Sequence, residues 1–178
     1  YKRQGGYAEN MLLTSSLLLQ IPNGLSAERA ALTEPMAVGR HAVEKAAGSL
    51  DGSCLVIGCG PVGLAVIAAL KQKGCGPIVA SDFSPRRREL AEILGADEVI
   101  NPADSSPYDS WRAISTSFKK TIDKASPHDG IRPNGGGIIF ECVGVPGVIE
   151  EIMTGAMKGT SVVVVGVCMQ QDLSLIHI

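Results

Sequence analysis

The chain has 178 residues, of which 45% are hydrophobic and 19% are charged, and its formal net charge is -2 at pH 7. This length provides for one domain, or for one domain with part of another, and the apolar content excludes an intrinsically disordered chain. Because charges of both signs are interspersed, apart from a short arginine run at 86–88, we expect a small-molecule partner rather than nucleic acid or a membrane surface.

The cysteines and the short apolar runs of the sequence indicate in which cellular compartment we expect the protein. The five cysteines, at positions 54, 59, 75, 142 and 168, include no C-x-x-C pair, and several lie in apolar runs where a thiol acts as a small hydrophobe. The apolar runs are far shorter than the ~20 residues of a membrane span, and no signal peptide opens the sequence. We expect a cytoplasmic protein with no membrane segment.

The first part of the chain predicts a hairpin followed by two helices. Two strand-like runs, 7–13 and 17–21, lead to the turn sequence Pro22-Asn23-Gly24. Ser26 is suited to cap a short helix that ends near residue 32. A second helix is predicted over 35–47, because the residue before Pro35 avoids helical geometry whereas proline suits a first helical position.

From residue 48 onward, apolar strands alternate with helices. The predicted strands are 54–58, 77–82, 98–101, 138–143 and 162–167, and the predicted helices are 61–73, 85–94, 107–124 and 148–158, with a surface loop at 126–137. Strands that are apolar on both faces and joined by helices belong to parallel sheets covered on both sides. The pattern therefore predicts an α/β fold with a doubly wound parallel sheet.

A glycine-rich loop, Gly58-Cys59-Gly60-Pro61-Val62-Gly63, lies between the first of these strands and its helix. Gly58 suits the tight turn, Gly60 offers a surface without a Cβ where a pyrophosphate can approach, and Gly63 lets helix and strand pack closely. The helix that begins near Pro61 directs backbone N–H groups and the positive end of its dipole at the phosphates. This combination predicts a dinucleotide site.

An acid, Asp82, ends the second predicted strand. A carboxylate there can accept hydrogen bonds from both hydroxyls of the adenosine ribose and would repel a 2′-phosphate, which favours NAD over NADP. Arg86 or Arg87 can instead meet a 2′-phosphate, lie over the adenine, or be solvated. The alternative role for Asp82 is to cap the following helix together with Ser84.

Several segments carry a family resemblance: Gly5-Gly6-Tyr7-Ala8-Glu9, Leu32-Thr33-Glu34-Pro35-Met36-Ala37-Val38-Gly39-Arg40-His41-Ala42-Val43, Val56-Ile57-Gly58-Cys59-Gly60-Pro61-Val62-Gly63, Leu94-Gly95-Ala96-Asp97 and Phe140-Glu141-Cys142-Val143-Gly144. In order and spacing they resemble the medium-chain zinc-dependent alcohol dehydrogenase family, especially its sorbitol, butanediol and threonine dehydrogenase branches. The resemblance implies that residues 1–35 end a GroES-like β catalytic domain and that 36–172 form an incomplete Rossmann NAD-binding domain. The apolar tail 173–178 resembles translated adapter sequence, and we assign it no site.

The resemblance also implies roles for single residues. Glu34, the acid of an E-P motif, would bind the catalytic zinc or hold its water; the alternative is that it complements the dipole of the helix that follows. Val38 would line the nicotinamide face, and His41 is expected to pack in the core. The other implied coenzyme contacts are the adenosine-side pair Val143 and Gly144 and the backbone groups of Val165, Gly166 and Val167 that would receive the carboxamide; the alternative for these apolar positions is plain core packing. Arg87 is a further candidate contact because of its position after Asp82, not because of the resemblance.

Two zinc sites of the family have no full match here. The other ligands of the catalytic zinc, a cysteine and a G-H-E motif, and the four-cysteine structural site are expected upstream. The last Rossmann strand is expected downstream. The resemblance thus implies an NAD- and zinc-dependent dehydrogenase of a secondary alcohol or polyol, a homo-oligomer when full length, with this polypeptide inactive alone. The alternatives are a zinc-free quinone or enoyl reductase of the same superfamily and a non-catalytic NAD-sensing domain.

Overall fold

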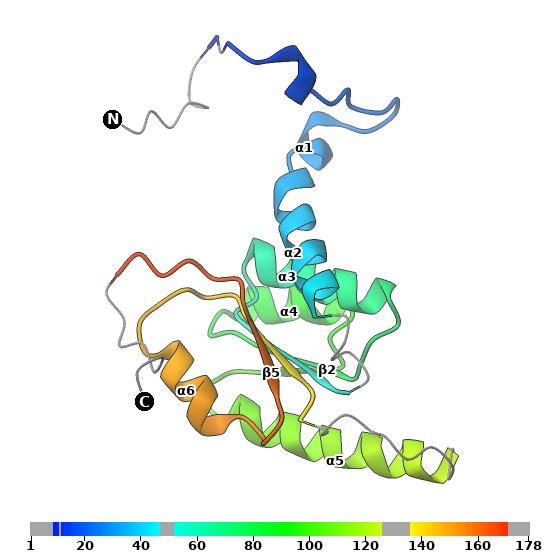
Figure 1. Cartoon of the computed structure of the whole chain (residues 1–178), viewed down its shortest axis with the longest axis vertical. Coiled ribbons are helices and arrows are strands. Elements are labelled where there is room, and N and C mark those ends of the chain that lie inside the picture. Colours follow the sequence, from blue (N-terminus) through cyan, green and yellow to red (C-terminus); the bar gives the residue numbers. More distant parts are fainter. Residues whose placement is uncertain (1–8, 11, 47–51, 126–135, 171–178) are drawn as a thin grey trace. The chain divides into compact units, whose positions relative to one another are not determined.

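The computed structural model describes residues 9–10, 12–46, 52–125 and 136–170, with side chains omitted over 119–125 (Figure 1). Contacts divide the chain into two compact units, Tyr1–Thr33 and Glu34–Ile178. In the described part of the chain no helix is both long enough and apolar enough to cross a membrane.

The first unit contains short helices in place of the predicted hairpin. A 3₁₀ turn, η1 (Ser15–Leu17), ends at the first residue of the second strand-like run. No described residue of this unit is in a strand, so the hairpin prediction is wrong here; the run 7–13 lies partly outside the described residues. An isolated two-stranded hairpin is marginally stable, and the leucines of this segment are exposed, with no sheet face to bury them.

The turn and the cap that follow are confirmed. The amide of Leu25 donates to the carbonyl of Pro22 at 3.1 Å, which closes the turn through Asn23 and Gly24. Ser26 caps α1 (Ala27–Ala30), since its hydroxyl accepts from the amide of Arg29 at 3.4 Å. The helix ends earlier than the predicted residue 32.

The second unit is built on a parallel sheet whose described strands follow the order β3-β2-β1-β4-β5. The strands are β1 (Cys54–Ile57), β2 (Ile78–Ser81), β3 (Glu98–Ile100), β4 (Ile138–Glu141) and β5 (Ser161–Val164). Because β1 comes first in sequence but lies in the middle, the chain winds outward in both directions from it. The predicted doubly wound α/β fold is confirmed.

Helices cover both faces of this sheet. They are α2 (Thr33–Lys45), α3 (Pro61–Gln72), α4 (Pro85–Leu94), α5 (Pro107–Ala125) and α6 (Val148–Gly155). In Figure 1, α2 and α3 lie on one side of the sheet and α5 lies on the other. One core cluster joins the sheet to α2, α3 and α4, and a second joins it to α5 and α6, where Trp111 and Ile152 are fully buried. Each strand stops one to three residues before its predicted end, so that the candidate site residues lie in the loops that follow.

Two expectations for α2 are wrong. The helix begins at Thr33 rather than at Pro35, which is tolerated because the amides of a first turn have no intrahelical partner and proline loses no bond there. His41 is exposed instead of packed in the core. The buried stripe of α2 runs through Gly39, Ala42 and Val43 at three- and four-residue steps, and position 41 falls outside it.

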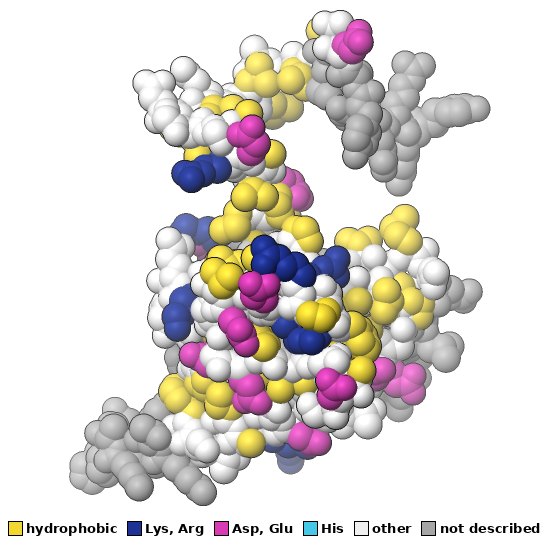
Figure 2. All heavy atoms as spheres, turned by 180° about the vertical axis from the view of Figure 1, so that it is seen from behind, with side chains coloured by type: hydrophobic (Ala, Val, Ile, Leu, Met, Phe, Trp, Pro, Cys, Tyr) yellow, Lys and Arg dark blue, Asp and Glu magenta, His cyan; other side chains and the backbone are white. Residues whose placement is uncertain are grey.

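Surface charge is mixed on the face shown in Figure 2, where Lys and Arg side chains lie among Asp and Glu side chains. The described surface also carries three short-range ion pairs: Arg40 with Glu44, Arg86 with Glu89, and Arg112 with Asp109. All six side chains are largely exposed, so each pair contributes little to stability.

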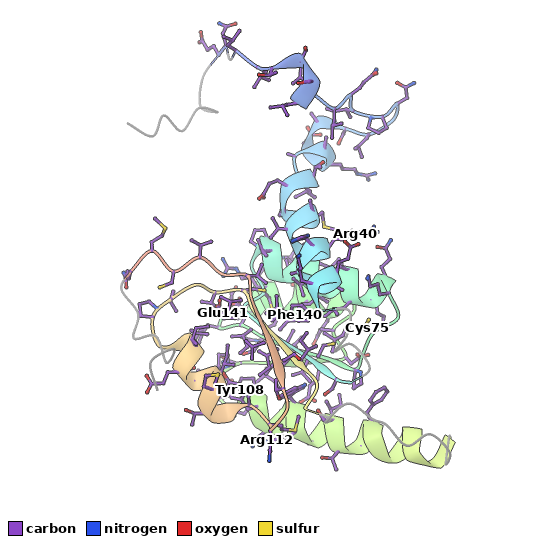
Figure 3. All side chains as sticks on the ribbon, in the orientation of Figure 1. Arg40, Cys75, Tyr108, Arg112, Phe140 and Glu141 are labelled. Atoms are coloured by element: carbon purple, nitrogen blue, oxygen red, sulfur yellow. The ribbon has the colours of Figure 1, made fainter. Side chains whose placement is uncertain are left out.

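Phe140 and Phe83 provide a matched test of this core. Phe140 lies in β4, where Figure 3 labels it, and is 0% exposed. Phe83 follows β2 and is 71% exposed. We expect Phe140→Ala to lower the free energy of unfolding by about 3 to 5 kcal/mol through the cavity it leaves. Phe83→Ala should change it by less than about 0.5 kcal/mol. Urea unfolding measures both, and equal losses would contradict the described core.

Candidate functional site

The glycine loop between β1 and α3 has the tight turn that its sequence predicts. Gly58 has φ +89°, a conformation that residues with a Cβ rarely adopt. A Cβ at this position would also lie 2.7 Å from Cγ2 of Val143 and 3.1 Å from the carbonyl oxygen of Cys142. The turn therefore brings the loop against the end of β4, and only glycine fits.

The other two glycines of the loop differ in the space around them. A Cβ on Gly63 would overlap the carbonyl oxygen of Gly58, so this glycine lets α3 approach the loop. A Cβ on Gly60 would have no atom within 4 Å. Packing thus accounts for glycine at 58 and 63, whereas the glycine at 60 borders open space of the kind that a ligand needs.

The amino terminus of α3 faces this opening. Gly60 is the N-cap and makes no side-chain cap, and Pro61 occupies the first helical position. The amides of a first turn, here those of Val62 and Gly63, have no partner within the helix and attract negative charge. The arrangement is an anion-binding geometry made of backbone alone.

Asp82 lies at the end of β2 and is held against the glycine loop. Its side chain is 9% exposed, Oδ2 accepts from the amide of Cys59 at 2.8 Å, and Oδ1 accepts from the amide of Ser84 at 2.8 Å. The bond to Ser84 fits the alternative role at the next helix, although Ser84 itself makes the cap to the amide of Arg87 at 3.5 Å. Each carboxylate oxygen has a second lone pair, so Asp82 can still accept from a ligand.

The structure distinguishes the three neighbouring arginines. Arg86 pairs with Glu89 at 2.6 Å. Arg88 donates to the carbonyl oxygens of Asp82 and Phe83, at 2.7 and 2.8 Å. Arg87 is the one whose guanidinium lies beside the carboxylate of Asp82, at 3.6 Å. Between the two arginines left open by the sequence, Arg87 is therefore the one at the candidate site.

The loops after β4 and β5 complete the edge of the site. Gly144 has φ +70°, and a Cβ there would lie 2.5 Å from the amide nitrogen of Val167. A Cβ on Gly166 would in turn overlap the amide nitrogen of Gly144. Val165 is partly buried against the core, whereas Val167 is exposed. The residues that the family resemblance singled out in these loops are thus in close contact with one another.

Glu141, the last residue of β4, is a site residue that sequence reasoning left without a role (Figure 3). Its side chain is 2% exposed, and Oε1 accepts from the amides of Val143 and Gly144, at 2.7 and 2.8 Å. An acid that ends an apolar strand was the available signal, because a buried carboxyl group requires hydrogen-bond partners.

The cysteines of the site are unsuited to nucleophilic chemistry. Burial, followed by the charge of Asp82, raises the pKa of Cys59 to about 12. Burial and the charge of Glu141 raise the pKa of Cys142 to about 12 in the same way. Because a thiolate is the reactive form, both groups are inert near neutral pH. The site is therefore suited to bind a ligand, and its cysteines are not suited to act as nucleophiles.

Glu34 and Val38 lie on α2, which packs on α3 where Gly39 meets Ala65. Val38 is half-buried, and Glu34 is exposed in the first turn, where it also complements the helix dipole. Within the described ranges, no group of three or more His, Cys, Asp or Glu residues could hold a metal ion. One carboxylate does not make a zinc site, so the described residues alone do not fit the metal.

The strand order, with a glycine loop at the point where the winding direction reverses, defines a Rossmann-type domain. Residues 61–177, well over half of the chain, match the family model "Zinc-binding dehydrogenase". The chain belongs to this family of zinc-binding dehydrogenases.

Individual relatives agree with this membership. The chain is 28% identical over 171 residues to a sorbitol dehydrogenase of Bacillus subtilis (strain 168), covering 96% of this chain and 44% of the relative. It is 34% identical over 161 residues to the (R,R)-butanediol dehydrogenase of the same strain, covering 90% and 42%. A solved structure, galactitol-1-phosphate dehydrogenase from Escherichia coli, superposes with a TM-score of 0.70 at 25% identity, covering 96% and 44%. The resemblance predicted from the sequence is confirmed, and the chain spans less than half the length of these relatives.

Gly60 and Gly63 differ in the space around them, and this difference predicts how alanine at each position changes stability. Gly63→Ala should lower the free energy of unfolding by about 1 to 3 kcal/mol, because its Cβ overlaps the carbonyl oxygen of Gly58. Gly60→Ala should leave it unchanged within about 0.5 kcal/mol, since Gly60 has φ -70° and open space around it. Chemical denaturation compares the two variants, and a Gly60→Ala variant as unstable as Gly63→Ala would refute the described loop.

Proposed function

We propose that the protein containing this chain is an oxidoreductase that transfers a hydride between a secondary alcohol or polyol and NAD, and that residues 36–172 supply its NAD-binding domain. The observation that carries the proposal is the hydrogen bond from the Cys59 amide to the Asp82 carboxylate. This bond supports the proposal because it holds the carboxylate that would bind the ribose beside a loop suited to bind a diphosphate.

The diphosphate would bind at the amino terminus of α3. The amides of Val62 and Gly63 supply donors, the helix dipole favours the negative charge, and the open space at Gly60 admits the phosphate oxygens. No basic side chain is needed for this contact. The site therefore binds the part of the coenzyme that NAD and NADP share, and selectivity comes from elsewhere.

Selectivity would come from Asp82 and Arg87. The second lone pairs of the Asp82 carboxylate can accept from the two ribose hydroxyls, and its charge repels a 2′-phosphate. The Arg87 guanidinium, 3.6 Å away, compensates that charge while the acid is present. If the acid is removed, the same guanidinium becomes available to a phosphate, so the pair sets the preference for NAD.

The remaining coenzyme contacts would come from the loops at the ends of β4 and β5 and from α2. Val143 and Gly144 would lie beside the adenosine or its ribose, and the backbone of Val165 to Val167 would receive the carboxamide. Val38 would line the nicotinamide face. Support comes from the family membership and from the close contact between Gly144 and Val167.

For the metal, we propose Glu34 as the acid of this chain that binds zinc or holds its water. The support is the E-P motif and the membership in a family of zinc-binding dehydrogenases. We also propose that residues 1–35 end a GroES-like catalytic domain, and that the full-length enzyme is a homo-oligomer. A reducing, cytoplasmic compartment fits the buried thiols of Cys54 and Cys59.

The coenzyme preference can be tested with two substitutions. Asp82→Asn keeps the size of the side chain and one acceptor oxygen but removes the charge. We expect it to shift the ratio of kcat/KM for NAD over NADP toward NADP by about tenfold or more. Adding Arg87→Ala should remove most of the gain with NADP, because the phosphate then loses its cation.

Glu89→Gln is the control for these two substitutions, since it removes a negative charge from α4, the helix that carries Arg87, without touching Asp82. It should leave the ratio unchanged. An unchanged ratio in Asp82→Asn, or an undiminished gain in the double variant, would refute the assigned roles of Asp82 and Arg87.

The reaction itself can be tested with purified protein containing this chain. We expect NADH formation, followed by absorbance, with sorbitol or (R,R)-butanediol as the alcohol, and we expect chelation to abolish it and added zinc to restore it. Full activity after complete metal removal would support a zinc-free reductase instead. Tight NAD binding without turnover of any alcohol would support a non-catalytic NAD-sensing domain.

A further inference from the structure

Glu141 connects two loops through two different sets of hydrogen bonds. It lies on β4 between β1 and β5, where its Cα partners are Ile57 and Val164. Its carboxyl oxygen Oε1 accepts from the amides of the loop after β4, at Val143 and Gly144. Its main-chain oxygen accepts from the amides that follow β5, those of Val165 at 2.8 Å and Gly166 at 2.9 Å.

The carboxyl group also limits the space between these loops. A Cβ on Gly166 would lie 2.6 Å from Oε2 of Glu141 and would overlap the amide nitrogen of Gly144. The two loops can meet only because both carry glycine at the contact. The carboxyl group of Glu141 occupies the remaining space, so the separation of the loops depends on this side chain.

The same contact reaches the glycine loop. Cγ2 of Val143 lies 2.7 Å from where a Cβ on Gly58 would stand, so the backbone position of residue 143 determines how closely β4 approaches the turn after β1. The amide of Cys142 adds a bond to the carbonyl oxygen of Ile57 at 2.8 Å. A shift of the loop that Glu141 holds would therefore alter three loops at one edge of the sheet.

We propose that Glu141 is a positioning residue for the coenzyme. It acts through Val143, Gly144 and Gly166, whose backbone it sets at the spacing that the adenosine and carboxamide contacts require. This inference rests on the proposed NAD site. It adds a residue that touches neither the coenzyme nor the reacting atoms and yet sets the spacing of both contacts, of which a ligand without nicotinamide makes only the adenosine one.

Three substitutions of Glu141 separate the effect of its hydrogen bonds from the effect of its side-chain volume. Glu141→Gln keeps an acceptor oxygen for the two amides, whereas Glu141→Met has a similar length but removes the acceptor that both amides use. Glu141→Asp keeps the charge on a side chain shortened by one methylene, which cannot span to both amides in the same geometry. This variant carries the test if Glu141→Met does not fold.

The measurement is the dissociation constant for NAD and for ADP-ribose, by calorimetry on the protein containing this chain, together with kcat, KM and the melting temperature. We expect Glu141→Met and Glu141→Asp to weaken NAD binding by about tenfold or more, and Glu141→Gln by less than about threefold. The loss should be larger for NAD than for ADP-ribose, which lacks the nicotinamide.

The possible results distinguish a failure of the proposed NAD site from a failure of the proposed role of Glu141. If the unsubstituted protein binds no NAD, the proposed function itself fails. If it binds NAD and all three variants bind as well as it does, only the role of Glu141 fails. Equal losses for both ligands that follow the fall in melting temperature would show a purely structural residue and would also overturn the inference.

Discussion

The hydrogen bond between the Cys59 amide and the Asp82 carboxylate links the turn after β1 to the end of β2. Since Asp82 also accepts from the amide of Ser84, one side chain fixes the glycine loop and the start of α4 at once. The acid is nearly buried, with Arg87 close enough to offset its charge. The proposed diphosphate and ribose contacts all depend on this bond, because it sets the distance between the helix that receives the phosphates and the acid that receives the sugar.

Close packing at one edge of the sheet supports this bond. In a parallel sheet the carboxyl ends of neighbouring strands lie side by side, so the loops after β1, β2, β4 and β5 meet there. Gly58 against Val143, and Gly144 against Gly166, leave no room for additional atoms. Glu141 joins the last two loops, and the open space at Gly60 is left as the approach for a ligand. A closely packed edge that is open at Gly60 suits a coenzyme that binds in an extended conformation.

The sequence was sufficient for features that depend on local chemistry. Helix α4 has the predicted bounds because Ser84, Pro85 and Gly95 mark its two ends, and the strands followed from continuous apolar runs. The sequence was not sufficient to predict features that depend on residues far away along the chain. The hairpin failed because strands need a neighbouring strand, and the choice between Arg86 and Arg87 depends on Glu89 and on side-chain geometry. The part of Glu141 that the sequence could not predict is the contact of its carboxyl group with Gly166, which forms only when β4 and β5 pair; its bonds to the amides of Val143 and Gly144 are local.

The most direct test of the central claim is a crystal structure of the protein containing this chain in complex with NAD. The account predicts the diphosphate within hydrogen-bond distance of the amides of Val62 and Gly63, and both adenosine ribose hydroxyls within hydrogen-bond distance of Asp82. A complex in which the adenosine lies away from Asp82, or in which the diphosphate is bound by side chains outside the glycine loop, would contradict it.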